Sequence, residues 1–100
     1  MVHHIILWKL KDGYTPEEQE TIRLGIRQNL TALVGKIDGL LSLSVLLPGL
    51  SSSTADVMLD STFRDAEALK AYSVHPDHVR AADTFVRPFT SVRLSLDYED

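Results

Sequence analysis

The segment Val2-His3-His4-Ile5-Ile6-Leu7-Trp8-Lys9-Leu10-Lys11 is rich in β-favouring residues and contains neither glycine nor proline, which predicts a first strand over residues 2–11. Successive side chains of a strand point to opposite faces. One face of this strand therefore carries His4, Ile6 and Trp8, while the other carries Ile5 and Leu7. Both faces are apolar at the centre of the strand. A sheet with one wet face alternates apolar and polar residues, so this segment predicts a sheet that is covered on both sides.

The chain after this strand carries a strong helix signal. Asp12-Gly13 ends the strand, and Thr15-Pro16-Glu17-Glu18 combines an N-cap residue, a proline at the first helical position and a capping box. Apolar residues then recur at spacings of four and three, which places one stripe on the helix: Ile22, Ile26, Leu30 and Leu33. We expect Gly35 to end this helix.

Two strands, two helices and a last strand are indicated by the remaining residues. Residues 39–47 and 55–63 alternate apolar and polar side chains, and we expect the serine-rich loop 48–54 between them to be the most mobile internal segment. Residues 65–74 are helix formers, and His75-Pro76 breaks that helix because the residue before proline disfavours helical geometry. Pro76 then begins a helix that runs to about Arg87, and residues 91–98 alternate again.

The order β-α-β-β-α-α-β predicts an α+β, ferredoxin-like fold with a four-stranded antiparallel sheet, as a single domain over residues 1–100. Within 39–47, one face would carry Leu41, Leu43, Val45 and Leu47. A large apolar sheet face open to water is rare in monomers and marks an interface. We therefore expect a homodimer in which two sheets pack face to face as a dimeric α/β barrel. The alternative is a monomer with scattered exposed apolar residues.

Composition excludes several classes of protein. The 100 residues include 10 Lys plus Arg and 14 Asp plus Glu, which gives a net charge of -4. A nucleic-acid-binding protein needs an excess of basic residues, so this class is excluded. The absence of cysteine excludes disulfides, thiolate metal sites and thiol nucleophiles. No apolar run approaches the roughly 20 residues that span a bilayer, and no signal-peptide pattern is present. These features are typical of a cytoplasmic protein without a membrane partner.

Four segments resemble the stress-responsive A/B barrel domain (Dabb) family. They are His4-Ile5-Ile6-Leu7-Trp8-Lys9-Leu10-Lys11-Asp12, Gly35-Lys36-Ile37-Asp38-Gly39-Leu40, Ala68-Leu69-Lys70-Ala71-Tyr72-Ser73-Val74-His75-Pro76-Asp77-His78, and the C-terminal part with Arg87-Pro88-Phe89 and Asp97-Tyr98. The Tyr72 to His78 block is the most specific of these. The resemblance covers essentially the whole chain and implies a dimeric α+β barrel.

The family includes a plant polyketide cyclase, and the resemblance to it implies catalytic residues. A tyrosine and a histidine of that cyclase act on the substrate, and they match Tyr72 and His78 here. A histidine of its first strand lies at the pocket and matches His4.

Further ligand-binding residues are expected around the same pocket. The aromatic lining of the cyclase's first helix matches Ile22, Arg23 and Ile26, so Arg23 departs from the family's apolar lining. We also expect Ile6 and Trp8, which share a strand face with His4, to line the pocket together with His75.

The residue types also favour acid–base chemistry at Tyr72 and His78. Tyr72 closes one predicted helix and His78 opens the next, so the break at His75-Pro76 can turn both side chains inward. A helix N-terminus disfavours an imidazolium, which keeps His78 neutral as a base, and the Tyr72 hydroxyl can donate to a carbonyl oxygen. The alternative is that both residues only tie together the polar groups of the joint. His75 and His78 have the spacing of a metal pair, but the proline break separates them, and we expect no metal and no cofactor.

Three functions remain open on these grounds. The first is a small dimeric pocket protein that binds an apolar or aromatic small molecule, with no reaction assigned. The second is a cofactor-free enzyme of the polyketide-cyclase (aldol cyclisation or lyase) or monooxygenase type that uses His78 and Tyr72. The third is a structural, stress-protective dimer without a ligand. A cavity that joins His4, Trp8, Tyr72 and His78 would favour the first two.

Overall fold

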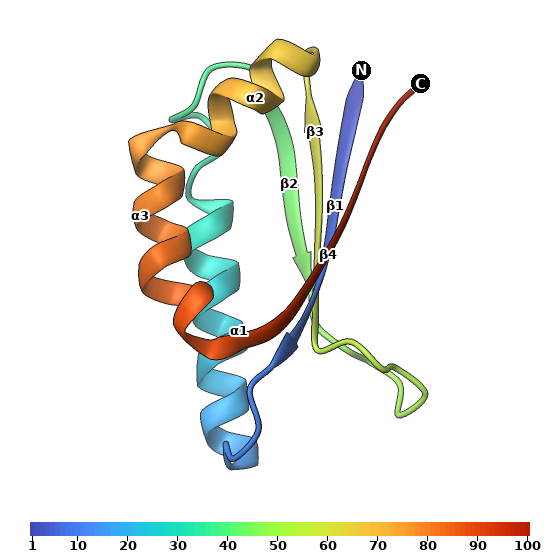
Figure 1. The fold of residues 1–100 in the computed structure, drawn as a ribbon, viewed down its shortest axis with the longest axis vertical. Coiled ribbons are helices and arrows are strands. Elements are labelled where there is room, and N and C mark those ends of the chain that lie inside the picture. The colour runs from blue at the N-terminus through green and yellow to red at the C-terminus, as the bar shows by residue number, and fades with distance from the viewer.

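The structure, a computed structural model, describes residues 1–100 and has the predicted ferredoxin-like architecture. Its elements follow in the order β1 (Val2–Leu10), α1 (Pro16–Thr31), β2 (Leu40–Leu46), β3 (Val57–Phe63), α2 (Ala66–Val74), α3 (Pro76–Phe85), the 3₁₀ turn η1 (Arg87–Phe89) and β4 (Thr90–Glu99). The strands form one antiparallel sheet in the order β2-β3-β1-β4, and the helices cover one of its faces (Figure 1). The predicted fold class is confirmed. No helix is long and apolar enough to cross a membrane.

Helix α1 begins where the capping box predicts and ends earlier than expected. The Thr15 hydroxyl accepts from the Glu18 N–H, and the Glu18 carboxylate accepts from the Thr15 N–H, at 3.1 and 2.9 Å. The helix stops at Thr31, so the expected end at Gly35 is wrong. The Thr31 hydroxyl donates to the Arg27 carbonyl in the last turn, and Gly35, with φ of +87°, serves the turn that follows the helix.

The helix-facing side of the sheet forms the hydrophobic core with α1 and α2. Ile6 and Trp8 of β1 are buried there, opposite Leu59 and Val57 of β3. In β2 the register shifts between Leu40 and Ser42, and this bulge changes which residues face the helices. Leu40 is therefore buried together with Leu43 and Val45, whereas Leu41 is exposed, so its predicted position is wrong.

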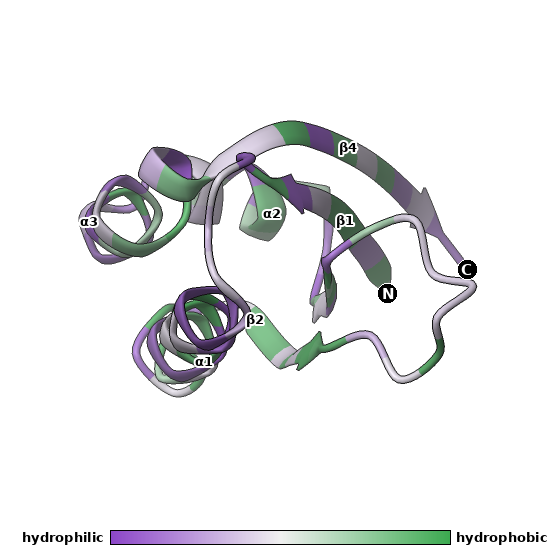
Figure 2. Cartoon of the chain, turned by 90° about the horizontal axis from the view of Figure 1, so that it is seen from below, coloured by the Kyte–Doolittle hydropathy of each residue, from purple (hydrophilic) through white to green (hydrophobic).

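Strand β4 carries its apolar side chains on the face away from the helices. Leu96 lies opposite Ile5, and Leu94 lies opposite Leu7, and opposite residues of an antiparallel pair share a face. Leu94 and Leu96 are 64% and 65% exposed. Figure 2 shows the resulting alternation of apolar and polar bands along β4. We call this uncovered apolar surface the open face; its members are Ile5, Leu7, Leu46, Met58, Val92, Leu94, Leu96 and Tyr98.

Candidate functional site

A cavity of about 330 Å³ lies between the sheet and the helical layer. Its apolar part is formed by Ile6, Trp8, Leu30, Leu59, Ala82 and Val86. Its polar part is formed by Tyr72, Ser73, His78, Arg87, Thr90 and Arg93. The volume falls at the lower end of the range of small-molecule sites, about 300–1,000 Å³. Four of the sequence-predicted site residues, Ile6, Trp8, Tyr72 and His78, are thus brought around one cavity.

The joint between α2 and α3 places Tyr72 beside His78. The His75 N–H donates to the Tyr72 carbonyl and closes α2, and the His75 Nδ1 accepts from the Asp77 N–H and caps α3, both at 3.1 Å. His75 is therefore a capping residue at the joint and does not line the cavity. Three residues after it, the imidazole of His78 lies 4.2 Å from the Tyr72 ring, centre to centre, with the two planes tilted by 35°.

The Tyr72 hydroxyl is buried and has no hydrogen-bond partner. The side chain is 1% exposed and packs edge-on against Phe63, with ring centres 5.0 Å apart. Burial raises the pKa of Tyr72 to about 12, against the opposing effect of the Arg93 charge. The hydroxyl therefore keeps its proton at all ordinary pH values. A buried hydroxyl without a partner lowers the free energy of unfolding by about 1–3 kcal/mol. The Tyr72 hydroxyl therefore reduces stability, and it remains available as a hydrogen-bond donor.

The ring of His78 has the protonation pattern of a base. Its Nδ1 lies 3.3 Å from the carbonyl oxygen of Ser73. A carbonyl only accepts, so in the neutral ring Nδ1 carries the proton and Nε2 holds the free lone pair. Burial lowers the pKa of His78, the hydrogen bond to the Ser73 carbonyl opposes this, and the positive charges of Arg87 and Arg93 add to the lowering. The predicted neutrality of His78 thus has burial as its first cause.

His4 lies next to the cavity without lining it. Its Nδ1 is hydrogen-bonded to the carboxylate of Asp97 on β4, and its carbonyl accepts from the buried Ser61 hydroxyl at 2.9 Å. Its ring meets Tyr72 edge-on, with centres 6.5 Å apart. His4 therefore contacts Tyr72 but is not among the residues that line the cavity, where the family resemblance implies a pocket residue.

The predicted ligand residues of α1 lie elsewhere. Ile26 is fully buried in the core, and Ile22 lines a separate groove between α1 and α3. Arg23 donates from Nη2 to the Asp56 carboxylate and from Nε to the Asp56 carbonyl, both at 3.2 Å. The departure of Arg23 from the family's apolar lining therefore leaves the cavity unaffected.

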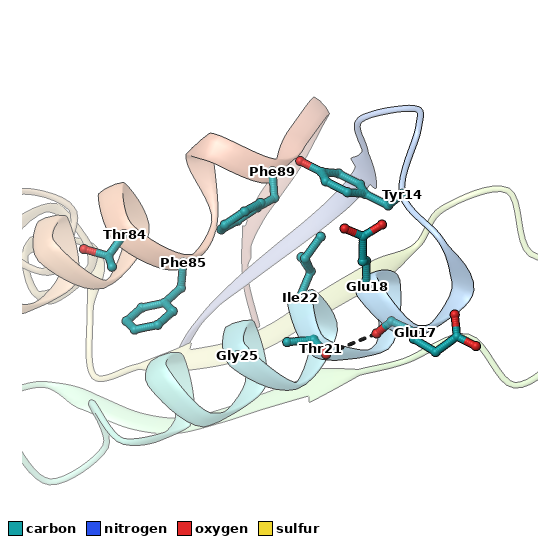
Figure 3. Close-up of a pocket in the computed structure, with 9 residues that line it drawn as sticks. All are labelled: Tyr14, Glu17, Glu18, Thr21, Ile22, Gly25, Thr84, Phe85 and Phe89. Atoms are coloured by element: carbon teal, nitrogen blue, oxygen red, sulfur yellow. Dashed lines mark hydrogen bonds between the residues drawn. The ribbon is translucent and has the colours of Figure 1, made fainter.

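The α1–α3 groove is larger, about 540 Å³, but it lacks an acid–base pair. Figure 3 shows Tyr14, Ile22, Phe85 and Phe89 along it. The Glu18 carboxylate at its rim is already engaged by the capping box. The groove has no buried side-chain polar atom without a partner, in contrast to the cavity at Tyr72. We therefore place the candidate site at the smaller cavity.

Arg93 is the lining residue that sequence reasoning missed most clearly. It belongs to the polar set of β4, which an ordinary sheet would turn toward water. In the structure it pairs with Trp8 across the β1–β4 register and lies on the helix-facing side. The signal was present in the sequence: once the apolar set of residues 91–98 is assigned to the open face, the polar set must lie on the other side of β4, which faces the helices although its residues stay exposed.

Comparison with known proteins agrees with this architecture. The sequence model of the Stress Responsive A/B Barrel Domain family, abbreviated Dabb, matches residues 2–100. The chain belongs to the Dabb family. Two Dabb relatives, both described as stress-response A/B barrel domain-containing proteins, come from Arabidopsis thaliana. The first is 33% identical and the second is 31% identical, each over 98% of this chain.

The extent of these matches differs. The chain spans only 36% of the length of the first plant relative and 88% of the length of the second. A solved structure from Bacteroides fragilis, described as a dimeric protein of unknown function with a ferredoxin-like fold, has a TM-score of 0.92 and 30% identity. That match covers 99% of this chain and 95% of the other. The ferredoxin-like fold is thereby established, and this solved structure is described as dimeric.

Proposed function

We propose that this Dabb domain forms a homodimer in which each protomer binds a small apolar or aromatic molecule in the 330 Å³ cavity. The observation that carries the proposal is the buried, unpartnered hydroxyl of Tyr72, a residue that lines a cavity with an apolar and a polar part. Nearly all buried polar groups of folded proteins are paired, and interiors are packed without large voids. A domain built for stability alone would fill the cavity and pair the hydroxyl. A ligand with one acceptor atom does both.

The sole tryptophan provides a direct test of ligand binding. Trp8 is 4% exposed and lines the cavity, so its indole N–H gives a single NMR signal from the site. A small neutral aromatic, 4-methylbenzamide, should shift this signal in a saturable way. Ala82→Leu places extra volume in the cavity and should abolish the shift, whereas Ala71→Leu on the exposed side of α2 should preserve it. An unshifted signal in the wild-type protein at millimolar probe would contradict the proposal.

The dimer is supported by the open face. Its leucines on β4 would be left in water in a monomer, and an apolar surface of this kind is typical of an interface. The Bacteroides fragilis relative is described as dimeric, at 30% identity. Two copies that pack through their open faces would cover Ile5, Leu94 and Leu96 and leave the cavity on the outer, helix-covered side of each sheet.

A second candidate function, cofactor-free proton abstraction, is favoured by the Tyr72–His78 pair. The Nε2 lone pair of His78 would remove a proton from the carbon next to a carbonyl, and the electron pair of that C–H bond would move onto the carbonyl oxygen. The Tyr72 hydroxyl would donate to this oxygen as its charge grows. In an aldol cyclisation the enolate carbon would then attack a second carbonyl of the same molecule, and the His78 imidazolium would return the proton to the new alkoxide.

Deuterium exchange tests this chemistry without knowledge of the natural substrate. In heavy water, the methyl protons of acetophenone should exchange faster with the protein than without it. His78→Ala should abolish the acceleration, and His75→Ala, which changes a histidine outside the cavity, should preserve it as long as α3 stays folded. Equal exchange with wild type and His78→Ala would remove the catalytic candidate and leave the binding function intact.

A further inference from the structure

The charged residues that line the cavity are all cationic. Arg87 and Arg93 contribute to its wall, and no aspartate or glutamate does. The chain as a whole has a net charge of -4, so the cavity is opposite in sign to the protein around it. Such local charge complementarity attracts an anionic ligand.

The two arginines differ in what they already bind. Arg87 already donates from Nη1 to the Asp83 carboxylate. Arg93, an exposed residue of β4, has no hydrogen bond and no ion pair within the chain, so its guanidinium is hydrated and open to a ligand. Each of the five other arginines has at least one hydrogen-bond partner: Arg23, Arg27, Arg64, Arg80 and Arg87. Asp97, which lies four residues along the same face of β4, is itself engaged by His4.

The guanidinium of Arg93 acts on both polar groups of the candidate site. Its charge lowers the pKa of the Tyr72 phenol against the effect of burial, and no other charged group contributes to that shift. It also contributes to the lowered pKa of His78. Arg93 and Tyr72 line the same cavity, which therefore combines a cation that has no partner in the chain with a buried hydroxyl that has none.

We propose that the ligand of this cavity carries a carboxylate that Arg93 binds, while its apolar or aromatic body lies on Ile6, Trp8 and Leu59. The planar fork of a guanidinium matches the two oxygens of a carboxylate, and the cavity offers one free cation for one negative charge. This inference rests on the proposed binding function and gives it a substrate class, small apolar or aromatic carboxylic acids. Arg93 would determine specificity, and Tyr72 and His78 would remain free for the reacting atoms.

A matched pair of probes tests the inference. 4-Methylbenzoate and 4-methylbenzamide have the same shape and differ in charge. We would titrate each into the protein at pH 8, where the acid is ionised and His78 is neutral, and follow the indole N–H signal of Trp8. The benzoate should bind about tenfold more tightly, the effect of one hydrogen bond to a charged group. In Arg93→Gln this preference should disappear while the amide still binds, and in Arg93→Lys a part should remain.

The outcomes separate this inference from the proposed function. Equal affinity of the two probes for the wild type would overturn the assignment of Arg93 and leave the binding function standing. A preference that survives in Arg93→Gln and disappears in Arg87→Gln would assign the carboxylate to Arg87 and also overturn the inference. Binding of neither probe at millimolar concentration would overturn both the inference and the proposed binding function.

Discussion

Gly39 lies directly beneath Ala68, so that a β-carbon added to Gly39 would stand 2.5 Å from the Ala68 β-carbon. The contact sets how closely the first turn of α2 approaches the start of β2. Tyr72 lies one helical turn beyond Ala68, so the same contact fixes the height of the Tyr72 ring above the sheet. The position of the candidate site thus depends on Gly39, which lies against the first turn of α2, the helix that carries Tyr72.

Gly39→Ala should destabilise the domain through two effects. Gly39 has φ of +85°, which costs an alanine about 1 kcal/mol or more, and the overlap with Ala68 adds to this. Gly35→Ala is the matched control, because Gly35 has φ of +87° and no atom within 4 Å of an added β-carbon. Denaturant unfolding should show a loss of stability for Gly39→Ala that exceeds that of Gly35→Ala by at least about 1 kcal/mol. Equal losses would mean that α2 is free to move away.

The dimer should depend on the open face and not on exposed leucines in general. Leu7 and Leu24 are exposed to a similar extent, 38% and 41%, but Leu7 lies on the open face and Leu24 on α1. Leu7→Lys should therefore dissociate the dimer, because it would bury a charge at the interface, while Leu24→Lys should have no effect. Sedimentation at micromolar concentration measures this directly. A wild-type protein that sediments as a single chain would contradict the proposed dimer.

The strands, and the side of the sheet to which each side chain points, could be predicted from the sequence wherever apolar and polar residues alternate regularly. His4, Ile6 and Trp8 do share the helix-facing side, as their spacing of two predicts. Alternation misled at Leu41, because a bulge is a change of register that depends on the neighbouring strand. The end of α1 was also misplaced, because Gly35 signals a positive φ without saying whether it ends a helix or forms a later turn.

The candidate site was predictable only in part. The joint at His75-Pro76 brings Tyr72 and His78 together through local geometry, which sequence separation of six residues already suggests. The place of His4 depends on a long-range partner, Asp97, and no local pattern reveals that pairing. The role of Arg93 in the wall depends on which side of β4 faces the helices, and this follows only when the apolar side chains of β4 are assigned to the open face.

The loop between β2 and β3 should exchange its amide protons fastest among the internal segments. Residues 48–54 are exposed throughout, and the backbone bond from the Ser53 N–H to the Leu50 carbonyl, at 3.1 Å, lies within the loop itself. Such segments open at little free-energy cost. Hydrogen exchange followed by mass spectrometry checks this. Strong protection of Ser51 to Ser53 in a monomeric variant such as Leu7→Lys would contradict the prediction.

The pH dependence of acetophenone exchange should show one acidic limb. His78 acts as a base only when neutral, and its pKa lies below the usual 6.5, so the rate should rise with pH to a midpoint below 6.5 and then stay level. Tyr72, with a pKa of about 12, should cause no loss of rate up to about pH 10. Arg93→Gln removes a positive charge that acts on His78 and should move the midpoint upward. A midpoint above 6.5 in the wild type would argue against His78 as the base.

Tyr72→Phe should stabilise the domain and weaken its function at the same time. The hydroxyl is buried without a partner, so its removal relieves a desolvation cost and should raise the free energy of unfolding by about 1 kcal/mol. The phenyl ring keeps the packing against Phe63. Phe63→Leu is the control for the packing itself and should lower stability, because it removes ring volume from a fully buried position.

Removal of the Tyr72 hydroxyl should also slow turnover. If Tyr72 donates to the oxygen that becomes negative, Tyr72→Phe should slow acetophenone exchange by about 10- to 1,000-fold, the range for the loss of one such donor. If the hydroxyl serves only to hold the joint between α2 and α3, its removal should instead destabilise the fold and leave exchange and probe binding unchanged. Urea unfolding and deuterium exchange on one preparation distinguish the two roles. The donor role predicts that Tyr72→Phe raises stability and slows exchange, whereas the joint-holding role predicts that it lowers stability and leaves exchange unchanged. A residue that lowers stability and supports turnover is expected where a polar group is kept unpaired for a ligand.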